Sequence, residues 1–243
     1  KDSGAITIGH RDASIPFSYY DDNQKPIGFA MDLCAKIVDA VKAELKMPKL
    51  EVKYQLVTSA NRIPLIANGT VDLECGSTTN NVERQKQVAY TNTHFLTASR
   101  YVMKASAGIK SIDDIAGKTV SVEVGTSNAD FLTAKSDEFT KAGKKAIDIQ
   151  VFPKDTDAAN ALRTGKVDAY FGDAPVVAYY VKTATDAFAF GGDAINPIPV
   201  GIAIRKGDEL KAAVQAAIDG MYADGTMKTI LGNWEMSSSL MQK

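Results

Sequence analysis

The sequence holds few residues of the types on which most catalytic and metal-binding sites depend. Its 243 residues include only two histidines, His10 and His94, and two cysteines, Cys34 and Cys75. It contains no P-loop, dinucleotide-binding glycine motif, paired-histidine zinc motif or calcium loop. Both cysteines are predicted to be buried apolar residues without a disulfide bond, although an oxidising compartment would permit one. The absence of these motifs does not exclude an enzyme, but no catalytic chemistry is evident; we predict that the protein is not an enzyme and needs no metal or cofactor.

An excess of one charge and long apolar runs are also missing. The chain has 28 basic and 29 acidic residues, a net charge of -1 and a pI near 6.2. No basic field therefore points to a nucleic acid or an anionic membrane as a partner. Mainly apolar stretches such as residues 175–181 are far shorter than the ~18 residues that a transmembrane helix needs. Hydrophobic residues at 45% and charged residues at 23% are typical of a folded chain.

Strand-type and helix-type patterns alternate along most of the chain, most clearly in its first 75 residues. Apolar residues recur at helical spacing over residues 31–45, and a short helix at 62–68 is predicted to end at Gly69. The segments predicted to form strands are 5–9, 51–57 and 71–75, and residues 11–25 are predicted to form a loop. Such an alternation predicts an α/β fold with parallel strands flanked by helices.

A weak internal repeat indicates two lobes of related plan. Residues 66–76 and 162–172 each read as a helix end, a glycine, a Val-Asp pair, a strand and a second glycine. Residues 5–9 and 120–125 form a second matching pair of predicted strands. The alternative is that any α/β protein repeats helix-glycine-strand units without internal duplication.

Two extended stretches are predicted to connect the lobes. They lie at residues 98–103 and 195–200, and the second contains Pro197 and Pro199, which favour extended backbone. Two crossings imply that the C-terminal part returns to the first lobe. We therefore expect a first lobe of residues 1–98 and 200–243, a second lobe of 103–195, and a hinge made of the two strands. A cleft between lobes is a usual place for a small-molecule site.

Two segments have the composition of an anion site. Residues 76–85 follow a predicted strand, open a helix, and combine hydroxyl groups with Arg84, whose guanidinium can bind a carboxylate through two hydrogen bonds. Residues 125–130 repeat the order of strand, glycine, hydroxyl groups and helix start. The alternative is that these Ser, Thr and Asn side chains are simple helix caps.

With these segments the sequence resembles a known family, the periplasmic amino-acid-binding proteins of ABC importers. The resemblance is strongest to the glutamate- and aspartate-binding branch and extends over essentially the whole chain. The run from Glu74 to Gln87 is its most specific stretch, and the similarity weakens in the second lobe. The other matching stretches are residues 10–20, 61–65, 165–173 and 225–234. The resemblance implies a type II periplasmic binding protein, in which each of two lobes has a central sheet flanked by helices.

Carried over residue by residue, the resemblance also implies a complete amino-acid site. One set of residues would bind the α-carboxylate of the ligand and another its α-ammonium group, through charge-assisted hydrogen bonds. The implied α-carboxylate ligands are Arg84, Thr79, Thr126 and Ser127, and the implied ammonium ligands are Asp173 and Ser77.

The resemblance assigns Arg11, Arg62 and Ser59 to the distal carboxylate of glutamate or aspartate. Independently of any family, three arginines and one aspartate suit a ligand with two carboxylates and one amine. The sequence departs from the acidic-ligand branch at Glu123, where we expect a threonine, and at Thr156, where we expect a histidine. A carboxylate beside the ligand's distal carboxylate would repel it. Either Glu123 is paired with an arginine or points away, or the preference has shifted to glutamine or asparagine.

Two further alternatives share this fold. A cyclohexadienyl dehydratase would use a carboxylic acid such as Glu123 as a general acid, and a receptor would use the same two lobes as a sensing domain. The dehydratase is disfavoured because the residues for an α-amino acid, Arg84 and Asp173, are present, and the receptor because no membrane segment replaces a connection between the lobes. The resemblance favours a binding protein. It implies a periplasmic monomer whose partners are an amino acid and an ABC permease in the inner membrane, with no nucleic acid and with the secretory leader outside the given sequence.

Overall fold

The computed structural model describes residues 4–185 and 187–236. The chain divides into two compact units, one formed by residues up to 96 together with those from 199 onward, and one formed by residues 97–198. It passes into the second unit within β8 (Phe95–Lys104) and returns within β12 (Phe188–Val200). None of the helices in the described ranges is long and apolar enough to cross a membrane.

The first unit is built on a five-stranded sheet with the order β5-β1-β6-β13-β7. Strand β1 pairs in parallel with β5 and β6, whereas β13 is antiparallel to β6 and β7. A second, three-stranded sheet is formed by β2, β3 and β4. The bounds are β1 Ala5–His10, β2 Ala13–Ser14, β3 Ser18–Tyr20, β4 Pro26–Ile27, β5 Glu51–Leu56, β6 Leu73–Cys75, β7 Val88–Tyr90 and β13 Ala203–Arg205.

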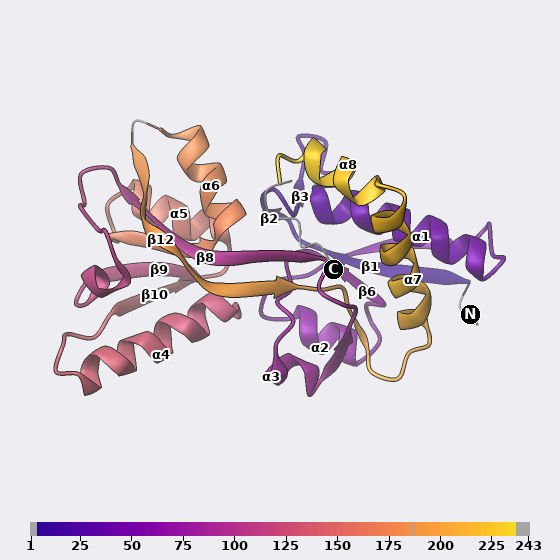
Figure 1. Ribbon diagram of the computed structural model, residues 1–243, viewed down its shortest axis with the longest axis horizontal. Coiled ribbons are helices and arrows are strands. Elements are labelled where there is room, and N and C mark those ends of the chain that lie inside the picture. Colours follow the sequence, from indigo (N-terminus) through magenta and orange to yellow (C-terminus); the bar gives the residue numbers. More distant parts are fainter. Residues whose placement is uncertain (1–3, 186, 237–243) are drawn as a thin grey trace. The chain divides into compact units, whose positions relative to one another are not determined.

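Helices cover both faces of this sheet. Helices α1, α7 and α8 lie on one face, and α2 and α3 lie on the other (Figure 1). The predicted helical stripe of α1 is confirmed, since residues such as Leu33, Ile37 and Val41 are buried. The apolar residues of each helix form a stripe that packs against the sheet, and its polar residues lie on the opposite side. The bounds are α1 Phe29–Glu44, α2 Arg62–Ala67, α3 Val82–Gln85, α7 Leu210–Ala223 and α8 Thr226–Asn233.

The second unit repeats this plan with a sheet of order β10-β9-β11-β8-β12. Helices α5 and α6 cover one face and α4 the other (Figure 1), and each face has its own apolar cluster. The prediction of an α/β fold with flanked central sheets is therefore confirmed. The bounds are β9 Thr119–Glu123, β10 Asp148–Phe152, β11 Ala169–Asp173, η1 Ile112–Ile115, α4 Ser127–Lys141, α5 Asp155–Arg163 and α6 Ala174–Thr183.

The internal repeat is visible in matching hydrogen bonds. In the first unit, the amide of Thr7 on β1 donates to Asp72 Oδ2 at 2.7 Å. In the second, the amide of Thr119 on β9 donates to Asp168 Oδ2 at 2.8 Å. Each aspartate belongs to the Val-Asp pair that the repeat predicts. The glycines that end α2 and α5, Gly69 and Gly165, have positive φ angles of 82° and 77°, a conformation that glycine adopts without steric cost.

Two predictions about the first unit are wrong. Cys34 and Cys75 form a disulfide bond, with their Cα atoms 6.2 Å apart. Cys34 lies on the buried face of α1 and Cys75 ends β6, so the packing of the helix on the sheet brings together two residues that are 41 positions apart. The predicted loop at 11–25 contains the short strands β2 and β3, which are too short to give a periodic pattern.

Candidate ligand-binding site

The candidate residues of the first unit follow the carboxyl ends of its strands. Arg11 comes directly after β1, and residues 76–81 connect β6 to α3. Ser59 and Arg62 lie after β5, in a turn held by Asn61, whose Oδ1 accepts a hydrogen bond from the amide of Thr58 at 2.7 Å. The carboxyl ends of parallel strands are the usual place for a ligand in an α/β sheet.

Arg11 is buried and forms hydrogen bonds through both its backbone and its side chain. Its Nη1 donates to Ser59 Oγ at 2.8 Å, and its amide donates to Ser18 Oγ at 2.9 Å. The structure therefore brings together Arg11 and Ser59, two of the three residues that the sequence assigned to a distal carboxylate. Ser18 was not foreseen, because a serine within a predicted loop gives no signal of its own.

Arg62 is 2% exposed and begins α2. Its Nη1 lies 3.8 Å from Oε1 of Glu74, which is 1% exposed on β6. The other carboxylate oxygen of Glu74 accepts a hydrogen bond from Thr78 Oγ1 at 2.5 Å. Glu74 was missed as a site residue, although a carboxylate on a buried strand at the start of the most specific sequence run is a usable signal.

Arg84 is held by the loop that precedes it. Asn81 is the N-cap of α3, and its Oδ1 accepts a hydrogen bond from the amide of Arg84 at 2.9 Å. Arg84 Nη1 donates to the backbone oxygen of Thr79 at 3.1 Å. The same loop is tied to the last residues of β12 by the hydrogen bond from the amide of Asn80 to Pro199 O at 2.8 Å. Ser77, Thr79 and Arg84 are all buried, so these hydrogen bonds hold the segment that the sequence predicts to bind an anion.

Four charged side chains of the first unit's candidate region are buried. They are Arg11, Arg62, Glu74 and Arg84. Three of them act on the pKa of Tyr90 on β7: burial raises this pKa to about 12, while Arg84 and Arg62 lower it in part and Glu74 raises it. The phenol is therefore protonated at neutral pH.

The second unit contributes polar residues at the ends of β9 and β11. Asp173 ends β11, and its Oδ1 accepts a hydrogen bond from Asn128 Nδ2 at 2.8 Å. Asn128 Oδ1 in turn accepts one from Ser99 Oγ at 2.6 Å, and all three residues are buried. This network fixes the carboxylate that the sequence assigned to an ammonium group. The sequence analysis did not identify Asn128 or Ser99, since their role depends on packing between α4, β8 and β11.

Glu123 is buried at the end of β9. It lies on the same strand face as Ser121, whose Oγ donates to Ala158 O on α5 at 2.9 Å, because side chains two residues apart point to the same side. Burial, with smaller effects of Asp155 and Glu123 among others, raises the pKa of Tyr170 well above its usual value. Glu123 therefore belongs to the face of the sheet that α5 covers.

The helix starts of the second unit carry the remaining candidates. Thr126 is the N-cap of α4; its Oγ1 accepts a hydrogen bond from the amide of Ala129 at 3.2 Å and donates to Glu123 O at 2.7 Å. The capping role considered for this segment is thus present, and Ser127 is the first residue of the helix. Thr156 lies in the first turn of α5 and is exposed.

Comparison with known proteins agrees with this geometry. The sequence profile of the bacterial extracellular solute-binding proteins, family 3, matches residues 6–237. The chain belongs to this family. It is 42% identical over 239 residues to the L-glutamate/L-aspartate-binding protein of Pseudomonas aeruginosa, covering 96% of this chain and 78% of that protein. It is 37% identical to the glutamate/aspartate import solute-binding protein of Salmonella typhimurium, covering 96% of this chain and 76% of that protein.

Solved structures of other solute-binding proteins are similar over nearly the whole chain. An ancestral arginine-binding protein bound to arginine has a TM-score of 0.84 and 28% identity, and the match covers 95% of this chain and 98% of that one. The solute receptor for L-cysteine of Neisseria gonorrhoeae also has a TM-score of 0.84, at 25% identity, over 96% of this chain and 90% of that one. The resemblance read from the sequence is confirmed at the level of family and fold.

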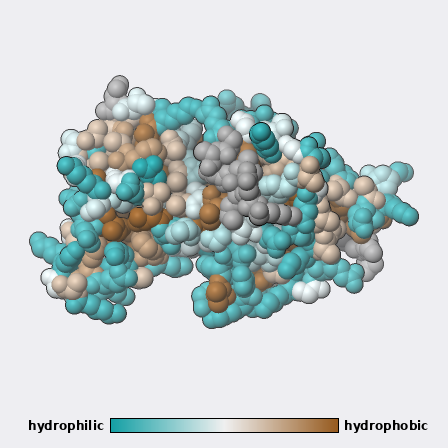
Figure 2. All heavy atoms as spheres, in the orientation of Figure 1, coloured by the Kyte–Doolittle hydropathy of each residue, from teal (hydrophilic) through white to brown (hydrophobic). Residues whose placement is uncertain are grey.

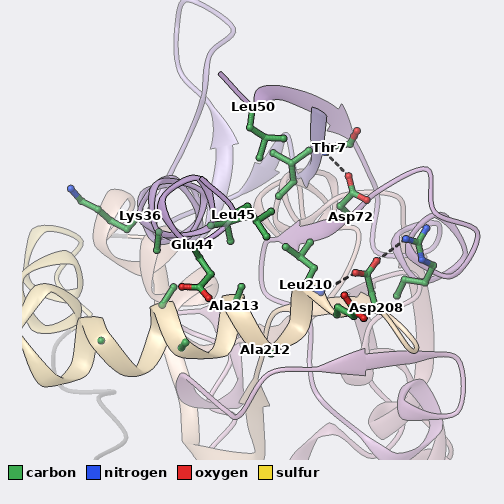
Figure 3. A pocket seen from close by; sticks show the side chains of 18 of the residues that line it. Thr7, Lys36, Glu44, Leu45, Leu50, Asp72, Asp208, Leu210, Ala212 and Ala213 are labelled. Carbon is green, nitrogen blue, oxygen red and sulfur yellow. Dashed lines mark hydrogen bonds and ion pairs between the residues drawn. The ribbon is translucent and has the colours of Figure 1, made fainter. Parts of the chain in front are cut away.

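The groove drawn in Figure 3 lies away from these solute-binding candidates. It has a volume of about 1780 Å³ and runs between α1 and α7, past the start of β1. Lys36 and Glu44 reach it from α1, and the small Ala212 and Ala213 line it from α7 (Figure 3). Arg11 follows the opposite end of β1. The groove therefore belongs to the amino-terminal edge of the strands and shares none of the candidate residues.

Surface hydrophobicity gives no second site on the visible face of the first unit. Figure 2 shows mainly hydrophilic atoms there, with a small apolar patch over α3, where Val82 is 72% exposed. Single exposed apolar residues are ordinary on folded domains. The candidate ligand residues are buried polar groups instead.

Proposed function

We propose that this solute-binding protein captures an acidic L-amino acid, glutamate or aspartate, and delivers it to an ABC permease from an extracytoplasmic location. One observation carries the choice of an acidic ligand: the first unit buries three arginines, Arg11, Arg62 and Arg84. The planar guanidinium of arginine binds a carboxylate through two hydrogen bonds, and an acidic amino acid has two carboxylates. The names of the relatives in Pseudomonas and Salmonella support the same ligand class.

The proposed binding mode assigns each ligand group to a set of residues. Its α-carboxylate is bound by the guanidinium of Arg84, and its distal carboxylate by Arg11 and Arg62. Its α-ammonium group is bound by Asp173, a role that the hydrogen bond from Asn128 supports by fixing the carboxylate. The further members of the proposed site are Ser59, Ser77, Thr79, Thr126 and Ser127, with Glu123 and Thr156 as the positions that modify selectivity.

The proposed mechanism is hinge closure. The chain passes between its two units twice, within β8 and β12, and two short connections are what a hinge requires. The ligand binds to one unit, the other unit adds its contacts, and the population shifts toward the closed form. The permease is proposed to recognise that form. Binding and release are the whole cycle, so no reaction is assigned to these residues.

Isothermal titration tests the ligand class. The protein is unfolded and refolded to remove any bound ligand, and L-glutamate, L-aspartate and L-glutamine are titrated separately. We expect glutamate and aspartate to bind with micromolar or lower Kd and glutamine to bind more weakly. Binding of glutamine alone would show that the protein prefers neutral polar amino acids. Glu123 and Thr156 would then be the residues that explain this preference.

Replacing Arg62 separates acidic from neutral ligands. In Arg62→Ala we expect glutamate affinity to fall about 100-fold, since two charge-assisted hydrogen bonds are lost, while glutamine affinity is spared. The change also removes the charge partner of Glu74. The double variant Arg62→Ala, Glu74→Gln removes both charges and serves as the control for folding. Retention of wild-type glutamate affinity in either variant rules out the role of Arg62 at the distal carboxylate.

A further inference from the structure

A carboxylate is buried in the same volume as the residues proposed to bind an anion. Glu74 is 1% exposed, and its Oε1 lies 3.8 Å from Nη1 of Arg62. At this distance the two groups attract each other as an ion pair but are beyond the 2.7–3.2 Å of an N–H···O hydrogen bond. A permanent anion beside Arg62 competes with any ligand carboxylate that approaches the same guanidinium. Its presence therefore needs an explanation beyond the proposed binding mode.

The surroundings of Glu74 hold it at ion-pair distance. Thr78 Oγ1 donates a hydrogen bond of 2.5 Å to Oε2, and Thr78 is itself buried. Gly76 packs directly over the carboxylate: a Cβ at this position would collide with Glu74 Oε1 and lie 3.2 Å from Cγ of Arg11. The hydroxyl of Thr78 thus fixes one carboxylate oxygen, and the other keeps its ion-pair distance to Arg62.

The burial of both groups makes this ion pair matter for binding. Arg62 is 2% exposed and Glu74 is 1% exposed, so water screens their interaction far less than it screens a surface pair. Both also act on the buried Tyr90, whose pKa Arg62 lowers and Glu74 raises.

We propose that Glu74 is a resident counter-anion of Arg62. It offsets the guanidinium charge in the ligand-free protein and weakens the hold on the ligand's distal carboxylate, so that binding stays reversible and selective. Glu74 acts through Arg62 and is a positioning residue. The inference rests on the proposed function, since it concerns the distal carboxylate of an acidic ligand.

The variant Glu74→Gln tests this proposal by its opposite effects on stability and affinity. Glutamine keeps the shape of the side chain and an oxygen for Thr78, but removes the negative charge beside Arg62. We expect the thermal unfolding midpoint of the ligand-free protein to fall, because the ion pair is lost. We expect the Kd for glutamate to decrease about tenfold, because the ligand carboxylate no longer competes with a resident anion. A merely structural role for Glu74 would lower both stability and affinity.

The variant Thr78→Val is the complementary test and is available even if Glu74→Gln does not fold. Valine has the shape of threonine but cannot hold Oε2, so the carboxylate can move into hydrogen-bonding distance of Arg62. The resident anion then competes more strongly, and we expect the Kd for glutamate to rise about threefold or more. A lower Kd, or an unchanged one, would overturn the proposal.

Glu83→Gln is the matched control. Glu83 lies on α3 next to Arg84, but its side chain is 77% exposed and pairs with Lys86, so solvent screens its charge. We expect no change in glutamate affinity from this variant. If Glu83→Gln lowers the Kd for glutamate as much as Glu74→Gln does, the affinity depends on the net charge of the protein alone. That result would overturn the assignment to Glu74. If the wild-type protein binds no acidic amino acid, the proposed function fails first.

Discussion

Arg84→Ala is expected to abolish amino-acid binding. The guanidinium of Arg84 is the proposed clamp for the α-carboxylate, a group that every L-amino acid carries. Losing two charge-assisted hydrogen bonds, each contributing about 1.5–3 kcal/mol, weakens binding at least about 100-fold. Unlike Arg62→Ala, this variant should lose glutamate, aspartate and glutamine alike. Isothermal titration with the three ligands distinguishes the two arginines.

The local structure makes this variant interpretable. The amide of Arg84 is held by Asn81, and that bond does not depend on the side chain. The side chain's own donation to Thr79 O is lost, so thermal unfolding of the ligand-free variant must be compared with the wild type. Lys86→Ala, at the exposed C-cap of the same helix, is the matched control and should bind normally. If Arg84→Ala binds glutamate with wild-type affinity, Arg84 does not bind the α-carboxylate as proposed.

Breaking the disulfide between Cys34 and Cys75 is expected to destabilise the first unit. The bond closes a loop over a sequence separation of 41 residues. A cross-link of this span stabilises a folded chain by about 2–4 kcal/mol, in the standard account by restricting the unfolded state. The double variant Cys34→Ala, Cys75→Ala should therefore lose about this much free energy of unfolding in a urea titration.

The control for this prediction is the same titration with a thiol reductant. The wild-type protein should shift toward the double variant, and the double variant should not shift further. Both sulfur atoms belong to residues that are completely buried, so mass spectrometry must show that reduction has occurred. A reduced wild-type protein with an unchanged midpoint would contradict the prediction. Glutamate affinity is a second readout, because Cys75 lies between Glu74 and Gly76 at the start of the proposed anion-binding segment.

Much of the candidate site was accessible from the sequence because its signals are local. A strand that ends in Gly76, followed by hydroxyl groups and an arginine, forms its hydrogen bonds within a few residues, as the Asn81–Arg84 cap shows. The resemblance assigned Arg11 and Ser59 to one carboxylate of the ligand, and the structure places these two side chains in contact. The location of Glu123 was left open, and the structure places it on the side of β9 that carries Ser121.

The parts that sequence reasoning missed all involve contacts between elements. Asn128 is an ordinary helical residue until α4 packs beside β11 and its amide reaches Asp173. Glu74 gains its importance only where β6 approaches the start of α2 and Arg62. Two cysteines in different elements carry no pattern that indicates whether they meet.

The sequence by itself determined the α/β alternation and the internal repeat, and its resemblance to known proteins gave the family and the prediction of an acidic ligand. The alternation and the repeat depend on hydrophobic periodicity, glycine conformation and residue type, which act over a few neighbouring positions. Only the tertiary structure decided that Cys34 and Cys75 are bonded, that Glu74 stands beside Arg62, and that Asn128 holds Asp173. The physical reason is that such contacts are set by how helices pack on a sheet, and residues far apart in the chain leave no local trace of it.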